Sequence, residues 1–106
     1  MKGNVFYRKD LAGVIEQTDA GFRFTYEQHY VNSNGEPISA TMPVSKVSFV
    51  SNTMFPFFDG LIPEGWLLDI AVKHWKISAT DRMKLLLTVC EDCIGAVSVI
   101  DQQKDE

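Results

Sequence analysis

The sequence has little of what most catalytic, metal-binding or membrane proteins depend on. Its 106 residues include two cysteines and two histidines. No apolar run approaches the roughly 20 residues that a membrane-spanning helix needs. The first five residues, MKGNV, lack the apolar segment of a secretory signal. We expect one domain, because a chain of this length builds a single core. We also expect a cytoplasmic protein with no metal ion, no cofactor and no membrane contact.

An excess of basic charge is also missing. Ten Lys and Arg residues stand against fourteen Asp and Glu residues, so the net charge is −4. A chain with this charge is on average repelled by nucleic-acid phosphates. We expect no direct nucleic-acid binding, and a basic surface on a protein partner is the better match.

Motifs that carry chemistry are few. Cys90 and Cys93 form a C-x-x-C pair, but the pair closes a predicted helix, whose negative end does not lower a thiol pKa. A zinc site needs further ligands, and His29 and His74 stand at unsuitable spacings. Redox or metal binding is kept as a minor alternative to two packed, reduced thiols. Paired carboxylates such as Asp59 and Glu64 can in principle do acid–base work, but capping or helix-start roles explain both, and we expect no enzymatic activity.

Periodicity predicts strands first and helices later. Strands are predicted over residues 4–8, 11–18, 22–26 and 38–42, with His29 and Tyr30 at a strand end, while residues 44–53 fit either a strand or an extended connection. Helices are predicted over residues 55–61 and 63–75 and from a capping box at Ser78 and Asp81, and a last strand over residues 96–100. The pattern indicates an α+β fold: a small antiparallel sheet, made of an N-terminal meander plus a C-terminal strand, with about three helices on one face. Residues 1–100 form the module and residues 101–106 a flexible polar tail.

The second of these helices has two unlike sides. At about 100° per residue, one side carries Leu67, Leu68, Ala71, Val72 and Trp75, which predicts the core face. The opposite side carries Trp66, Asp69, Ile70, Lys73 and His74. Because tryptophan is enriched in interface hot spots, Trp66 with Ile70 beside it predicts a partner-binding surface supported by Phe57 and Phe58. The alternative is that Trp66 folds back onto Phe57 and Phe58 as part of the core.

Two segments resemble one family. Residues 55–65, FPFFDGLIPEG, resemble the F-F-x-x-L-[LI]-P-E-G signature in the N-terminal subdomain of HipA-type serine/threonine kinase toxins. Residues 91–100, EDCIGAVSVI, resemble the R-D-x-x-G-A-V segment that ends that subdomain. Leu68 and Glu91 stand where the family often has arginine. A full HipA kinase continues into a catalytic core, whereas six residues follow here, and no glycine-rich phosphate loop or H-x-D catalytic loop is present.

The resemblance implies a function through protein contacts. The chain is similar to the small subunit of a three-part toxin–antitoxin system in which the HipA-like kinase is split into two polypeptides. This implies an antitoxin that binds and inhibits a separate HipA-like kinase toxin, with Trp66, Ile70, Asp69, Lys73, His74 and Phe58 as partner-binding residues. The kinase would phosphorylate a translation component such as an aminoacyl-tRNA synthetase, and a helix-turn-helix DNA-binding protein would be the third component. The alternative is a scaffolding or activating subunit that does not inhibit.

Overall fold

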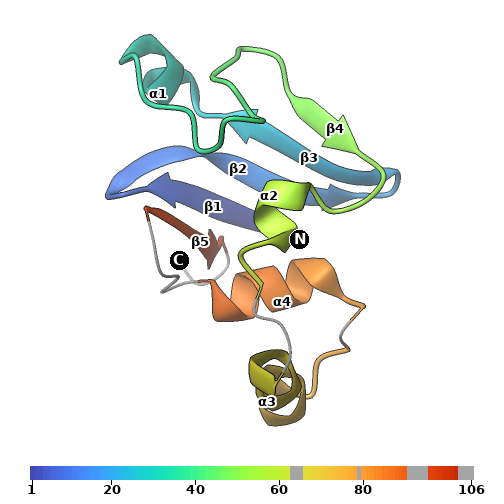
Figure 1. Ribbon diagram of the computed structural model, residues 1–106. Helices are drawn as coiled ribbons and strands as arrows, with labels where there is room; N and C mark the ends of the chain where they lie inside the picture. The colour runs from blue at the N-terminus through green and yellow to red at the C-terminus, as the bar shows by residue number, and fades with distance from the viewer. Residues whose placement is uncertain (63–65, 79, 91–95, 103–106) are drawn as a thin grey trace.

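Five strands form one antiparallel sheet, and its buried face positions the helices (Figure 1). The strands are β1 (Lys2–Tyr7), β2 (Asp10–Thr18), β3 (Gly21–Tyr26), β4 (Phe49–Ser51) and β5 (Val97–Asp101), in the spatial order β4-β3-β2-β1-β5. All neighbouring strands in this order are antiparallel. The predicted meander with a returning strand is confirmed, and β4 comes from the segment that the sequence leaves ambiguous. The computed structural model describes residues 1–62, 66–78, 80–90 and 96–102, except the side chains of Trp66, Leu67, Ala71 and Trp75.

Four helices accompany the sheet in the described ranges. They are α1 (Gln28–Asn32), α2 (Pro56–Asp59), α3 (Trp66–Trp75) and α4 (Arg82–Val89). Figure 1 shows α2 in front of the sheet, α4 beside β5, and α3 beyond α4, away from the strands. None of these helices is long and apolar enough to cross a membrane. The predicted α+β class is confirmed, and the sequence pattern fails to predict only α1 among them.

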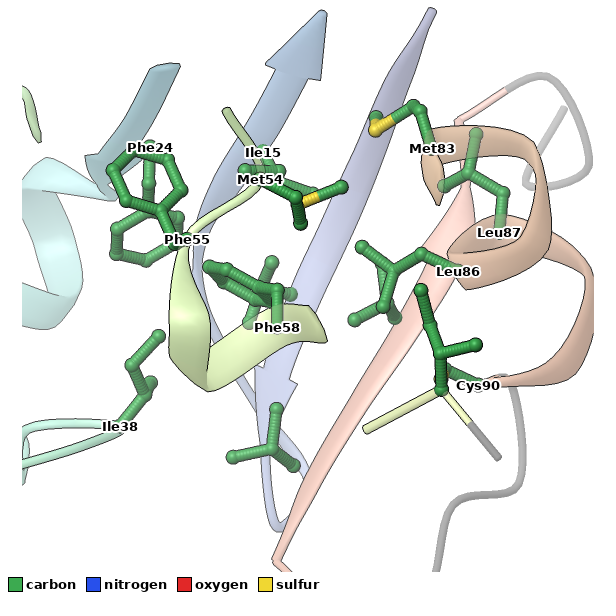
Figure 2. Close-up of a cluster of buried hydrophobic side chains, with 14 of the residues drawn as sticks. Ile15, Phe24, Ile38, Met54, Phe55, Phe58, Met83, Leu86, Leu87 and Cys90 are labelled. Atoms are coloured by element: carbon green, nitrogen blue, oxygen red, sulfur yellow. The ribbon is translucent and has the colours of Figure 1, made fainter. Parts of the chain in front are cut away.

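The core lies between one face of the sheet and the helices α2 and α4. Val5, Ile15 and Phe24, which alternate with outward residues along their strands, are fully buried, as the period-two geometry of a strand requires. Figure 2 places Phe58 of α2 and Leu86 of α4 in the same cluster. The buried residues of α4 are Met83, Leu85, Leu86 and Leu87. The sheet and the two helices therefore share one continuous core.

Residues 38–42 do not form the predicted strand. They contain an isolated antiparallel bridge between Ser39 and Met42. The Tyr26 hydroxyl accepts a hydrogen bond from the Ile38 N–H at 3.1 Å and donates one to the Met42 carbonyl oxygen. A buried side chain thus satisfies backbone groups that would otherwise need a neighbouring strand.

The prediction of a strand end at His29 and Tyr30 is wrong, because both residues lie in α1. The Glu27 carboxylate accepts hydrogen bonds from the N–H groups of His29 at 2.7 Å and Tyr30 at 3.3 Å. A side chain that caps the first N–H groups favours a helical turn over an extended chain. This capping residue, and not hydrophobic periodicity, starts the helix.

The predicted capping box of the last helix is displaced by one turn. Asp81, not Ser78, is the N-cap of α4, and its Oδ1 accepts a hydrogen bond from the Lys84 N–H at 3.2 Å. Ser78 instead accepts a hydrogen bond from the Thr80 N–H within the preceding turn. A carboxylate is a stronger acceptor than a hydroxyl for the helix N–H groups, which explains why Asp81 and not Ser78 caps α4.

The sheet extends slightly beyond residue 100. Strand β5 ends at Asp101, and the Gln102 N–H donates to the Lys2 carbonyl oxygen at 3.1 Å. The Gln102 side-chain amide also donates to Asn4 Oδ1 at 3.0 Å. These contacts tie residues 101 and 102 to β1, while residues 103–106 of the predicted tail lie outside the described structure.

Candidate partner-binding surface

Helix α3 is held at one end of the molecule by its inner side. Leu68 and Val72 are half-buried and pack against the core. After the helix, Lys76 takes a left-handed conformation with φ of 56°, and the Ile77 N–H donates to the Val72 carbonyl oxygen at 3.2 Å. This is the hydrogen-bond pattern of a Schellman helix end. Because Ile77 is itself buried, the end of α3 is fixed, and its outer side faces away from the sheet.

The outer side of α3 carries the predicted surface residues. Asp69, Ile70, Lys73 and His74 are all exposed, and Ile70 keeps 53% of its surface accessible. Asp69 and Lys73 are one helical turn apart, so opposite charges stand near an exposed apolar side chain. The predicted orientation of the helix is confirmed for the residues whose side chains are described. Their role in binding stays a prediction.

The side chain of Trp66 lies outside the described structure, so neither the exposed nor the core interpretation is tested. Its backbone forms the first residue of α3, four positions before Ile70. Side chains four positions apart on a helix lie on the same side. That Trp66 shares the outer side of the helix with Ile70 and His74 therefore stays a prediction from helix geometry.

Phe58 does not belong to the exposed surface. It is fully buried, and its ring contacts the rings of Phe24, Phe55 and Phe57 at centroid distances of 5.5, 6.2 and 5.3 Å. A ring without accessible surface cannot touch a partner in this conformation. Phe58 therefore supports α2 from beneath, and of the expected Phe57 and Phe58 platform only Phe57 is partly exposed.

The family-like segment around residue 60 is tied to α4 by two contacts. Arg82 Nε donates to Asp59 Oδ1 at 2.6 Å, which joins the start of α4 to α2. At the other end of α4, the Cys90 thiol donates to the Leu61 carbonyl oxygen at 3.4 Å. Asp59 and Leu61 therefore act in the packing of this segment against α4.

The geometry of Cys90 opposes redox or metal chemistry at this residue. Its side chain is fully buried at the C-cap of α4, and its carbonyl oxygen accepts the Val99 N–H at 2.9 Å. Low thiol pKa values occur at helix N-termini or beside cations, not at a buried C-cap. Cys93 lies outside the described residues, and among those described no group of three or more His, Cys, Asp or Glu residues is placed to hold a metal ion.

The sequence pattern does not predict two exposed apolar residues. Val47 and Val50 keep 73% and 71% of their surface accessible, and Val50 lies in the edge strand β4. Both belong to residues 44–53, which the sequence leaves ambiguous. Val50 is exposed because β4 is at the edge of the described sheet, and the sequence alone does not show which strand is at an edge. Edge strands of this kind are kept short in monomeric proteins, and β4 has three residues.

Comparison with known proteins decides the family. The sequence profile described as HipA N-terminal domain matches residues 3–100. The chain belongs to this HipA N-terminal domain family. An uncharacterised protein of Haemophilus influenzae is 33% identical over 102 residues, which are 96% of this chain and 93% of that protein. A solved structure described as the N-terminal domain of HipA toxin is 32% identical, with a TM-score of 0.73 over 93% of this chain and 90% of that chain.

A longer chain contains the same fold. One chain of a solved Shewanella oneidensis MR-1 toxin–antitoxin complex of HipA, HipB and its operator DNA matches 94% of this chain with a TM-score of 0.78 and 22% identity. This chain spans only 24% of that longer chain. The resemblance seen in residues 55–65 and 91–100 is thus confirmed, and this chain is a HipA-related component of the toxin–antitoxin kind.

Proposed function

We propose that this chain is a HipS-like antitoxin subunit that binds a separate HipA-like serine/threonine kinase toxin and inhibits it by protein contact. The observation that carries the proposal is the outer side of α3, where Ile70 is about half exposed near Asp69 and Lys73. Family membership supplies the class of partner. The chain itself is assigned no catalytic role.

The composition of this surface suits a protein interface. Interface cores combine exposed apolar anchors with a rim of charged groups that fixes orientation. Ile70 supplies an anchor, and Asp69, Lys73 and His74 supply the rim. Trp66, one turn before Ile70, would add the aromatic side chain that most often dominates binding energy. The surface lies on a helix away from the strands (Figure 1), so a partner can reach it without disturbing the sheet.

One relative consists almost entirely of this module. The aligned region covers 93% of the Haemophilus influenzae protein, so that protein consists of little more than the same module. In the Shewanella oneidensis chain the module is instead a quarter of a longer polypeptide. The fold thus occurs both as nearly a whole protein and as part of a longer chain, and the first arrangement is compatible with a module that acts on a separate partner.

In the proposed mechanism, Trp66 enters a pocket of the kinase near its nucleotide cleft. Ile70 packs at the edge of this pocket, and the cleft is held in a form that cannot transfer phosphate. Asp69 and Lys73 set the orientation through charged contacts at the rim, where each contributes little affinity. A helix-turn-helix DNA-binding protein is the proposed third component, and DNA is contacted through it.

The test is co-expression of this chain with the HipA-like kinase encoded beside it, following growth and co-purification together. Trp66→Ala should leave the melting temperature unchanged and weaken kinase binding by about 2–4 kcal/mol, the range of a hot-spot residue. Ile70→Ala should weaken binding by about 1 kcal/mol, because roughly half of its side chain remains to be buried. Binding is measured by calorimetry on the purified proteins, and inhibition by phosphate transfer to the kinase substrate.

Val47→Ala is the matched control. Val47 is an exposed aliphatic residue of the same kind, but it lies before β4 and not on α3. It should leave binding and growth unchanged. Wild-type neutralisation by the Trp66→Ala variant would refute the assigned mechanism.

A second function has one observation in its favour. The longer Shewanella oneidensis chain contains this fold within an assembly of HipA, HipB and operator DNA, so the module is compatible with an intact kinase chain. A subunit that completes or scaffolds the kinase would co-purify with it and leave toxicity unchanged or higher. The growth measurement in the same co-expression experiment separates this outcome from inhibition.

A further inference from the structure

A cavity of about 430 Å³ opens between the start of β2 and helix α1. Its lining residues are Asp10, Leu11, Glu27, His29, Tyr30, Ser33 and Gly35. The volume falls within the roughly 300–1,000 Å³ typical of ligand sites. In Figure 1 helix α1 lies at the opposite end of the molecule from α3. The cavity is therefore separate from the proposed kinase-binding surface.

One wall of the cavity is firmly built. The Tyr30 side chain is buried, and its hydroxyl donates to the Glu36 carbonyl oxygen. Gly35 lies directly against the Tyr30 ring, because a Cβ atom at Gly35 would come within 2.5 Å of ring atoms. The Gly35 N–H also donates to the Tyr30 carbonyl oxygen at 3.0 Å. The hydrogen bond of the hydroxyl and the close approach of Gly35 thus hold this wall in place.

The lining also includes the carboxylates of Asp10 and Glu27 and the imidazole of His29. Glu27 is fixed because its carboxylate accepts the N–H groups of His29 and Tyr30, and Asp10 begins β2. Burial is the largest cause that raises the pKa of the Tyr30 phenol, followed by the phenols of Tyr26 and Tyr7 and then by the carboxylates of Glu36 and Asp10. The two basic residues of the β1–β2 turn, Arg8 and Lys9, are not among the residues that line the cavity.

We propose that this cavity binds a basic side chain, arginine or lysine, presented by a partner polypeptide. The long aliphatic part of such a side chain packs against Leu11 and Tyr30, while its cationic end reaches Asp10 and Glu27. An anionic ligand would be repelled by the two carboxylates, and a purely apolar one would gain no electrostatic attraction from them. The net charge of −4 agrees with a basic partner.

This inference does not depend on the kinase-binding proposal. Because the two surfaces lie at opposite ends of the molecule, a partner at α3 leaves the cavity accessible. A basic polypeptide bound at α1 could then be held in one assembly with the partner at α3. The test therefore uses the free protein and a small probe, and its failure leaves the α3 proposal untouched.

The test is an amide chemical-shift titration of the isotopically labelled protein with N-acetyl-arginine amide. N-acetyl-citrulline amide, which has the same shape without the charge, is the reference probe. We expect shifts concentrated at residues 10–11 and 27–35 for the arginine probe and at least threefold weaker binding of citrulline. Asp10→Asn should weaken arginine binding at least threefold, whereas Asp19→Asn, an exposed aspartate in the β2–β3 turn, should not.

A second variant keeps the proposal testable if Asp10→Asn perturbs the spectrum. Leu11 is 38% exposed at the cavity, so Leu11→Lys introduces a competing cation and should abolish binding of the arginine probe. Equal binding of citrulline, shifts located elsewhere, or unchanged binding in both Asp10→Asn and Leu11→Lys would each overturn the assignment.

Discussion

Truncation of Phe58 distinguishes a core role from a partner contact. Phe58 is fully buried and contacts three other phenylalanine rings. Replacing such a ring with alanine removes its transfer free energy and leaves a cavity, at a cost of about 3–5 kcal/mol. A domain of this size has a total stability of about 5–15 kcal/mol, so Phe58→Ala removes a large part of it.

The expected change is large enough to measure by thermal and urea unfolding. Each kcal/mol lowers the melting temperature of a domain of this size by about 4–8 °C. Phe58→Ala should therefore lower the melting temperature by at least about 12 °C. Binding to the kinase, measured well below the new melting temperature, should be close to wild type, because the ring offers no accessible surface to a partner.

Phe57→Ala is the matched control for this prediction. Phe57 is the neighbouring phenylalanine on α2, and it is only half-buried. Its truncation should cost less, about 1–2 kcal/mol, because less apolar surface is returned to water. Equal losses of stability in the two variants would refute the burial argument. A Phe58→Ala protein of unchanged stability that binds the kinase weakly would show that Phe58 is a direct contact.

Three further changes test other parts of the structure. Asp81→Ala should lower the free energy of unfolding by about 1 kcal/mol, because Asp81 caps α4. Ser78→Ala should lower it by less than about 0.5 kcal/mol, and urea unfolding measures both variants. Gly35→Ala should cost about 1–3 kcal/mol through its clash with a ring, whereas at Gly60 a Cβ meets its nearest atom at 3.3 Å and alanine should be nearly neutral. Burial raises the pKa of Tyr26 above 10.0, so the folded state holds this proton more tightly than the unfolded state. The contribution of this proton to stability is complete below about pH 10 and is lost as the pH rises through the pKa of Tyr26 in the folded state. Urea unfolding at alkaline pH should therefore show a shallower loss of stability for Tyr26→Phe than for the wild type.

Residue pattern alone predicts the parts of the fold that depend on repeated burial. The strands β1, β2, β3 and β5 alternate buried and accessible residues, and α4 buries Met83, Leu86 and Leu87 at helical spacing, with Leu85 buried as well. Such elements are stabilised by many similar contacts, so their period is visible in the sequence. The α+β class follows from their order along the chain.

The parts that pattern misses depend on single side chains. Helix α1 forms because one carboxylate, that of Glu27, caps it. Residues 38–42 remain outside the sheet because one hydroxyl, that of Tyr26, takes two of their backbone groups. Neither effect has a period, and the second joins segments that are distant in the sequence. No scan of local propensity detects a hydrogen bond between residues whose proximity depends on the completed fold.

Several of the described residues that identify the family serve the packing of the core. Phe55, Phe58 and Ile62 of the family-like segment are buried, and Leu61 receives a hydrogen bond from Cys90. The described part of the segment therefore helps to specify how α2 packs against α4. Partner choice is then expected to depend on side chains outside the buried part of the segment. The ones that we propose for this role are the exposed residues of α3, with Ile70 the apolar one, and the acidic cavity beside α1 at the other end.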